Sequence, residues 1–333
     1  MEVGISVIIC CYNSATRLPE TIRHLAMQQF TDNVPFEIII VNNNSNDNTE
    51  EIANKELAKY NCAISFKVIN EPNPGLSQAR KTGIHSAKYC YSVFCDDDNW
   101  LNPDYLQVSF EIMESNSKIG MLGGQSTAVC EIDPPKWFES KKHGYAIGLQ
   151  GQESGDVTTR GYLWGAAIVL QTNVLTEMYN NGFISLLTDR NAKELSSGGD
   201  AEISAWFILA GYKLWYDSRL IFQHFIPKER LSEVYVRRLF EGFALASLKN
   251  FPYRRIVHFH SLKLIGRMKL FSKTSLKLIL AFIYPSRFKF QYAENLQWLQ
   301  LTVGGIVTFD SELASVQNML RKPLKRLKRK TKS

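Results

Sequence analysis

The sequence predicts an α/β protein with a doubly wound, mostly parallel sheet, and two observations support this class. Apolar runs of β-favouring residues alternate with helical patterns through the first 120 residues, and such alternation is typical of parallel strands joined by crossover helices. Polar clusters directly follow three of these runs. Ligands bind at the carboxyl ends of the strands in such sheets, so the three clusters are expected to meet in one crevice.

Each element of the first half has its own sequence signal. Runs of mainly β-favouring residues predict strands at 5–11, 36–41, 64–69 and 91–95. The first run is continuous, which suits a strand buried on both faces. Helical patterns that follow polar turns occupy residues 17–29, 49–60 and 76–87. A further helix is expected to begin with Asn102 as its N-cap and Pro103 in its first turn.

The alternation loosens after Gly124. Residues 125–160 are rich in Gly, Pro and polar residues and are expected to be irregular. Beyond them the sequence predicts a strand at 165–170, a polar loop at 186–199, a helix at 200–209 and a strand at 211–217. The chain is therefore divided into a domain of residues 1–230, with halves at 1–120 and 121–230, and a helical extension over residues 231–333.

Three consecutive acids, Asp96–Asp98, follow the fourth predicted strand. Adjacent carboxylates repel one another, and such a cluster usually needs a cation like Mg²⁺ or Mn²⁺, which prefer oxygen ligands. A divalent ion held there can bind a diphosphate. The alternative is a solvated acidic turn that only caps a helix. It is disfavoured because Tyr12-Asn13 and Asn42-Asn43 end two other predicted strands and should converge with the acids.

Missing motifs exclude some classes. No G-x-G-x-x-G and no G-x-x-x-x-G-K-[ST] opens a predicted helix, which disfavours a dinucleotide dehydrogenase and a P-loop NTPase. Six scattered cysteines without a C-x-x-C pair indicate reduced, cytosolic usage. We expect no signal peptide before the first strand, and no apolar run approaches the ~20 residues needed to span a bilayer.

Five motifs occur in an order that resembles glycosyltransferase family 2, which has the GT-A fold. They are Ser6–Ile9 with Tyr12-Asn13, Ile39–Ser45 with Asp47 and Thr49, Asn73–Ser77 with Ala79-Arg80, Asp96–Asp98 with Pro103-Asp104, and Gly198–Glu202. The resemblance runs from about residue 3 to residue 230. It implies inverting transfer of a sugar from a nucleotide-sugar donor to an acceptor hydroxyl, with Mg²⁺ or Mn²⁺ as the cofactor. It also makes residues 1–120 the nucleotide-sugar-binding half and residues 121–230 the acceptor and catalytic half.

The resemblance implies a set of donor-binding residues. Tyr12 is expected to stack on the nucleobase with Asn13 beside it, and Asn43 to accept a hydrogen bond from the base. Arg80 is expected to meet the base or a phosphate, and Trp164 to form a wall of the sugar pocket. The alternatives are a core-edge aromatic for Tyr12, a surface position for Arg80 and a packing role for Trp164.

The acidic motif carries the implied metal site. Asp96 is expected to contact the ribose and to share the metal with Asp98. Asp97 is also expected among the donor-binding residues, where it compensates for Asn99, which stands where the family often has an acid. His224 resembles a histidine that some GT-A enzymes use as a third metal ligand. The alternative for His224 is a structural role.

Asp200 matches the acid of the family's Glu-Asp motif, and Gly199 stands where the family has the Glu. The implied role of Asp200 is general base: its carboxylate takes the proton of the acceptor hydroxyl as that oxygen attacks opposite the leaving group. The alternative is a helix N-cap, and the two roles are compatible.

The charge is divided unevenly along the chain. Residues 225–333 hold 22 Lys and Arg against 6 Asp and Glu, a net +16, whereas residues 1–224 hold 17 against 26, a net −9. Basic helices with apolar faces are typical of membrane-surface elements, so residues 254–333 are expected to bind an anionic membrane. The alternative is a helical subdomain packed on the body. Nucleic acid is not expected as a partner, because no recognised motif accompanies the charge.

Together these features predict an inverting glycosyltransferase that uses a UDP-, GDP- or dTDP-sugar. We expect it to act on a glycan or lipid-linked glycan in bacterial-type surface polysaccharide, capsule or lipopolysaccharide synthesis, at the inner face of the cell membrane. One alternative is a nucleotidyltransferase, which would require a Gly- and Lys-rich loop in place of Cys11–Ser14. The other is a non-catalytic nucleotide-sugar-binding or scaffold protein, which the departures at Asn42, Asn99 and Gly199 leave open.

Overall fold

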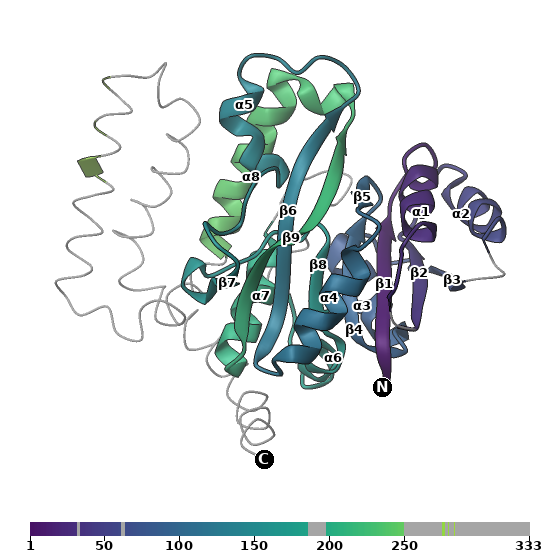
Figure 1. The fold of residues 1–333 in the computed structure, drawn as a ribbon. Helices are drawn as coiled ribbons and strands as arrows, with labels where there is room; N and C mark the ends of the chain where they lie inside the picture. The colour runs from purple at the N-terminus through teal and green to yellow at the C-terminus, as the bar shows by residue number, and fades with distance from the viewer. Residues whose placement is uncertain are drawn as a thin grey trace.

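A computed structural model describes residues 1–31, 34–60, 64–185 and 198–249, together with residues 275, 276, 279 and 283 (Figure 1). Within this part of the chain a nine-stranded sheet has the order β3-β2-β1-β4-β8-β6-β9-β5, and β7 pairs with β9. The α/β class and the mostly parallel central sheet predicted from the sequence are confirmed.

The first half of the sheet is parallel throughout. It consists of β1 (Glu2–Cys11), β2 (Phe36–Asn42), β3 (Ser65–Asn70) and β4 (Tyr89–Asp96). The alternate residues of β1 face different layers: Val7 and Ile9 pack in one apolar cluster and Ile8 in another. Both faces of the strand are buried, which explains why its sequence is a continuous apolar run.

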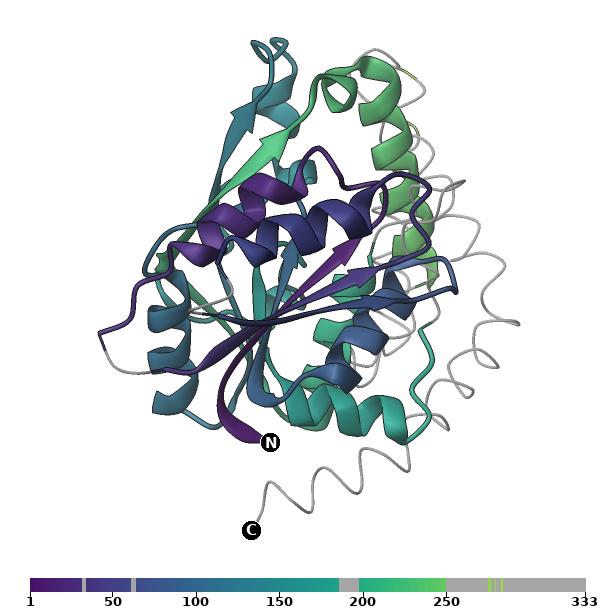
Figure 2. The same cartoon turned by 90° about the vertical axis from the view of Figure 1, so that its right-hand side faces the viewer.

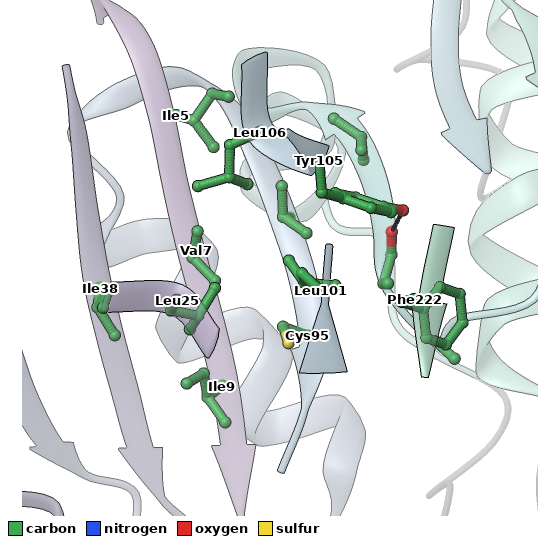
Figure 3. Close-up of a cluster of buried hydrophobic side chains, with 14 of the residues drawn as sticks. Ile5, Val7, Ile9, Leu25, Ile38, Cys95, Leu101, Tyr105, Leu106 and Phe222 are labelled. Atoms are coloured by element: carbon green, nitrogen blue, oxygen red, sulfur yellow. Dashed lines mark hydrogen bonds between the residues drawn. The ribbon is translucent and has the colours of Figure 1, made fainter. Parts of the chain in front are cut away.

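The helices cover both faces. One layer contains α1 (Leu18–Ala26), α2 (Thr49–Ala58) and α4 (Tyr105–Ser115). Figure 2 shows α1 and α2 side by side across the sheet. Figure 3 shows Leu106 near Ile5 and Leu25 near Val7 of β1, with Tyr105 on the side of Phe222. The other layer contains α3 (Leu76–Ser86), α6 (Thr172–Asn180) and α7 (Gly199–Ala210).

The second half of the sheet mixes directions. Its main strands are β6 (Ile119–Cys130), β8 (Ile168–Gln171) and β9 (Lys213–Ile226), with the short strands β5 (Asn99–Leu101) and β7 (Gly155–Asp156). β8 lies antiparallel between β4 and β6, and β6 is parallel to β9. A short helix α5 (Phe138–Lys141) and the 3₁₀ turns η1 (Lys142–Tyr145), η2 (Thr158–Arg160) and η3 (Lys228–Leu231) connect these elements.

Three local predictions in this half are wrong. The irregular segment was placed from residue 125, but β6 continues to Cys130, and the last strand continues past residue 217 to Ile226, because β6 and β9 pair with each other up to that point. Asn102 is not the N-cap of α4, which begins at Tyr105 after Asp104. The backbone N–H of Asn102 instead donates to the carbonyl of Ile221, because the chain there still follows β9.

The far ends of β6 and β9 carry a third apolar cluster. Helix α8 (Glu233–Lys249) lies along them, with Val236 and Leu239 packed against Ile226 and Tyr145 (Figure 1). The predicted extension therefore begins as a helix that packs on the body. Nearly all of residues 254–333, the segment expected to bind membrane, lies outside the described residues. No helix in the described part is long and apolar enough to cross a membrane.

Candidate active site

The strand register brings the polar clusters of β1, β2 and β4 to the same edge. Cys10 is level with Asp96, and Cys11 is level with Asn42. The loops after β1 and β2 are tied together, because Asn13 donates its backbone N–H to the Ser45 hydroxyl (3.0 Å) and accepts from the backbone of Asn46 (2.8 Å). This crosslink fixes the edge at which a ligand would bind.

Tyr12 projects from this edge and is 40% exposed. Its backbone N–H donates to the Ser14 hydroxyl (3.1 Å), which fixes the turn after β1. An exposed ring beside a fixed turn presents a face for stacking.

Asn43 uses its side chain to hold the loop before α3. Its Nδ2 donates to the carbonyls of Glu71 (3.1 Å) and Asn73 (2.7 Å), and its Oδ1 accepts from the backbone of Gly75 (2.8 Å). The neighbouring Asn42 donates to Asn70 (2.9 Å), while its own Oδ1 is buried without a partner in the described structure. Asn43 therefore shapes the loop beside the predicted base site.

The three acids have different partners. Asp97 accepts from Nε (3.2 Å) and Nη2 (2.6 Å) of Arg17 on the turn into α1. Asp98 accepts from Nη1 of Arg230 on η3 (2.7 Å) and faces Nε2 of His224 on β9 (3.3 Å). Sequence analysis missed both arginines, because they lie 80 and 132 positions from their acids.

These surroundings shift the pKa values of the two buried acids, Asp97 and Asp98, in opposite directions. Burial and the charge of Asp98 raise the pKa of Asp97, against the opposing effect of Arg17. Burial also acts to raise the pKa of Asp98, but the charges of His224 and Arg230 outweigh it and hold that pKa well below its usual range. Asp98 therefore holds its charge more firmly than Asp97 does.

The side chains of Asp98 and His224 fit a divalent cation. Nδ1 of His224 donates to the carbonyl of Tyr145 (2.7 Å), so Nε2 is the ring nitrogen that faces Oδ1 of Asp98. Either a proton on Nε2 or a cation between the two side chains would bridge this 3.3 Å contact. Octahedral Mg²⁺ with ligands at about 2.1 Å places neighbouring ligands about 3 Å apart.

The hydrogen bond from a ligating histidine to a backbone carbonyl is the usual support of such a ligand. Among the described residues, no group of three or more His, Cys, Asp or Glu side chains gathers for a metal. Among the described residues, Asp98 and His224 are thus two candidate ligands, to which Mg²⁺ commonly adds substrate phosphates and water. Asp96 lies at the end of β4, and its backbone N–H donates to the side chain of Asn99 (3.2 Å).

Asp200 lies in the first turn of α7. Its Oδ2 accepts from the backbone N–H of Gly165 (3.0 Å), and its Oδ1 from that of Ala201 (2.8 Å). The residue before the helix is Gly198, so the N-cap alternative for Asp200 is wrong. Each carboxylate oxygen accepts one backbone bond and keeps further acceptor capacity.

Arg80 connects the acidic edge with Asp200. It is 5% exposed, so the surface alternative is wrong, and its guanidinium lies 5.3 Å from the ring centre of Phe94 on β4. A Cβ on Gly165 would come within 2.7 Å of Nη2 of Arg80 and 3.1 Å of Cβ of Asp200. Arg80 and Asp200 therefore meet at Gly165.

The loop that carries Trp164 and Gly165 is held by residues that sequence analysis missed. Gln150 accepts from the backbone of Trp164 (2.6 Å) and donates to the carbonyl of Gly124 (3.1 Å). The guanidinium of Arg160 lies 5.2 Å from the ring centre of Trp164 and donates to the carbonyl of Gln150 (2.9 Å). No local signal marked these residues, which lie in a segment without regular hydrophobic spacing.

The fold and the acidic edge define an α/β protein of the GT-A type. Residues 6–161 match the family model described as "Glycosyl transferase family 2". This match confirms, for residues 6–161, the resemblance to glycosyltransferase family 2 that the motifs predicted.

Two curated relatives and one solved structure are similar to the chain. "Putative glycosyltransferase EpsH" of Bacillus subtilis is 38% identical over 104 residues, 31% of this chain and 28% of the relative. "Poly-beta-1,6-N-acetyl-D-glucosamine synthase" of Staphylococcus epidermidis is 30% identical over 122 residues, 36% of this chain and 28% of the relative. The crystal structure of S. aureus TarS 1-349 in complex with UDP-GlcNAc has a TM-score of 0.51 at 18% identity, over 91% of this chain and 92% of that one.

These similarities cover different shares of the chains compared. The chain spans less than a third of the length of both curated relatives. The TarS likeness extends over most of this chain and concerns the fold.

Proposed function

We propose that the protein is a metal-dependent, inverting glycosyltransferase that moves a sugar from a nucleotide-sugar to an acceptor hydroxyl. The observation that carries the proposal is the continuous link from the acidic edge to Asp200. Arg80 stacks on Phe94, two residues before Asp96, and reaches Gly165, whose N–H orients the Asp200 carboxylate. One end of this link suits a diphosphate and the other suits a proton acceptor.

A UDP-sugar is the favoured donor. The TarS structure with a similar fold was determined in complex with UDP-GlcNAc. In this chain Tyr12 would stack on the base, with Asn13 and the Asn43-held loop beside it, and Asp96 would contact the ribose. Asp98 and His224, with Asp96, would hold Mg²⁺ or Mn²⁺, which when bound neutralises charge on the leaving diphosphate.

The chemistry at the other end belongs to Asp200. The acceptor oxygen forms a bond to the anomeric carbon, the bond from that carbon to the diphosphate breaks with its electron pair, and the hydroxyl proton passes to Asp200. Two backbone N–H groups hold the carboxylate in one orientation before the acceptor arrives. Fixed orientation of a general base is a large part of its effect.

The acceptor is proposed to be a surface glycan or a lipid-linked precursor of one. The support is the printed name of the S. epidermidis relative, a poly-N-acetylglucosamine synthase. Residues 254–333 are proposed to hold the protein on an anionic membrane through their basic charge, which would place it at the inner face of the cell membrane. A chain ending at residue 253 should then stay in the supernatant with phosphatidylglycerol vesicles that sediment the full chain. Equal sedimentation of both would refute the membrane role.

The test of the function is a panel of nucleotide-sugars with Mn²⁺. The proposed donor should raise the melting temperature, because a ligand that binds only the folded state stabilises it by mass action. The same donor should release nucleoside diphosphate slowly without acceptor. No stabilisation by any donor would contradict the proposal, and binding without release would support the non-catalytic alternative.

A further inference from the structure

Two arginines are built into the acidic edge of the site. Arg17 is paired with Asp97 at 2.6 Å and Arg230 with Asp98 at 2.7 Å. Asp97 and Asp98 are 8% and 2% exposed, so solvent does little to screen either pair. The three acids thus carry about one net negative charge once both guanidinium groups are counted.

Arg230 and a cation would share one carboxylate. Arg230 donates to Oδ2 of Asp98, whereas Oδ1 faces Nε2 of His224, the position that suits a divalent ion. Both positive charges would then lie on opposite oxygens of the same group. The repulsion between these two charges is strong because the site is buried. Water would weaken the interaction of like charges a few ångströms apart, and little water reaches them here.

A diphosphate would remove this conflict. Its negative oxygens offer ligands to the cation and, at the same time, acceptors to the remaining N–H groups of Arg230. Guanidinium groups bind phosphate oxygens with well-oriented donors. The site therefore has a reason to take the cation and the diphosphate together.

We propose that Arg230 makes divalent-cation binding conditional on the diphosphate of the donor. This inference rests on the proposed function and assigns Arg230 a role in it: the cation alone is repelled, and the nucleoside diphosphate restores its affinity. Because coupling between two ligands is reciprocal, the cation must raise the affinity for the diphosphate by the same factor.

The first experiment measures Mn²⁺ binding to the full chain by electron paramagnetic resonance without nucleotide. Arg230→Gln, whose amide can still donate to Asp98, should bind Mn²⁺ about tenfold more tightly than the wild type, a typical size for such coupling. Arg230→Lys keeps the charge and should bind like the wild type. Arg219→Gln is the matched control, because it removes an arginine paired with Asp217 on the same strand, away from Asp98.

The second experiment measures UDP and GDP binding by calorimetry, with Mg²⁺ and with EDTA. Mg²⁺ should tighten nucleotide binding to the wild type about tenfold or more, and several-fold less to Arg230→Gln. If Arg230→Gln fails to fold, Arg17→Gln should also bind Mn²⁺ alone more tightly than the wild type, because it removes the second guanidinium.

The outcomes separate the two proposals. If Arg230→Gln binds Mn²⁺ no more tightly than the wild type, or if Arg230→Lys or Arg219→Gln gains as much, the role of Arg230 is refuted while nucleotide binding still supports the function. If the wild type binds neither nucleotide in either condition, both proposals fail.

Discussion

Gly165 donates its backbone N–H to the carboxylate of Asp200 at 3.0 Å, and the absence of a side chain on Gly165 leaves room for Arg80 next to Asp200. Gly165 thus sets the position of the proposed base, Asp200, and of the guanidinium of Arg80, which lies between Asp200 and the donor site. A displacement of about 1 Å in such a group is enough to lower a rate about a hundredfold.

Gly165→Ala should therefore lower kcat without unfolding the protein. The new Cβ would meet Nη2 of Arg80 at 2.7 Å and Cβ of Asp200 at 3.1 Å, so at least one of them must move. We expect kcat to fall about tenfold to a hundredfold, with a melting temperature close to that of the wild type. A variant with normal kcat would show that Asp200 does not depend on this contact.

Asp200→Asn should separate binding from turnover. The amide keeps the size of the carboxylate but accepts no proton, and loss of a general base typically costs about 10²- to 10⁴-fold in rate. UDP binding, measured by calorimetry with Mg²⁺, should stay within about twofold of the wild type.

The control for this prediction is Glu202→Gln. Glu202 is buried on the same helix and bonds the hydroxyl of Ser185, so its loss should affect stability more than rate. An equal loss of rate in both variants would indicate a general disturbance of α7 and would count against Asp200 as the base.

Asp98→Asn should lower stability in a pH-dependent way. Burial opposes ionisation of Asp98, but the charges of His224 and Arg230 lower its pKa in the folded state. The resulting stabilisation is present above the pKa of the unfolded chain, about 3.9, and is lost as the pH falls through the lower folded pKa. At pH 7 the variant leaves Arg230 without its anionic partner and should lose about 3–5 kcal/mol.

Urea unfolding at pH 7, 5 and 3.5 measures this difference. The gap between wild type and Asp98→Asn should be full at pH 7 and pH 5 and should narrow at pH 3.5, where the unfolded wild type takes up its proton. A gap independent of pH would show that the ionised form of Asp98 is not what the fold stabilises.

Asn43→Ala should destabilise the loop before α3. It removes three hydrogen bonds and leaves the N–H of Gly75 and the carbonyls of Glu71 and Asn73 without their partner. At about 1 kcal/mol for each bond, we expect a loss of about 2–3 kcal/mol in the free energy of unfolding. Asn42→Ala, which removes the one bond to Asn70, should cost about 1 kcal/mol. Equal losses in the two variants would contradict the loop-holding role of Asn43.

The sequence predicted the parallel half of the sheet closely. The run placed at residues 36–41 is β2 (Phe36–Asn42), and the helix placed at 49–60 is α2 (Thr49–Ala58). Strands buried on both faces must be apolar at successive positions, so their own residues reveal them. Four of the five motifs that carry the family resemblance lie at or just after the ends of those strands, whereas Gly198–Glu202 lies at the start of α7.

The second half resisted prediction because its elements depend on distant partners. Beyond the predicted end at residue 217, β9 contains Arg219 and His224, which no apolar run would include, yet it pairs with β6 through Ile226. The short strand β5 exists because Asn99 is level with His224. Strand pairing of this kind is decided by packing and not by local preference.

The sequence alone determined the layered α/β fold of the first half, the family resemblance of residues 6–161 and the location of Asp96–Asp98 at a strand end, because each depends on neighbouring residues. Only the tertiary structure decided that Arg17 and Arg230 form ion pairs with two of those acids. It also decided that the backbone N–H of Gly165 donates a hydrogen bond to Asp200. Two charged residues far apart in the sequence pair only when folding brings them together, so no local sequence pattern indicates the pair.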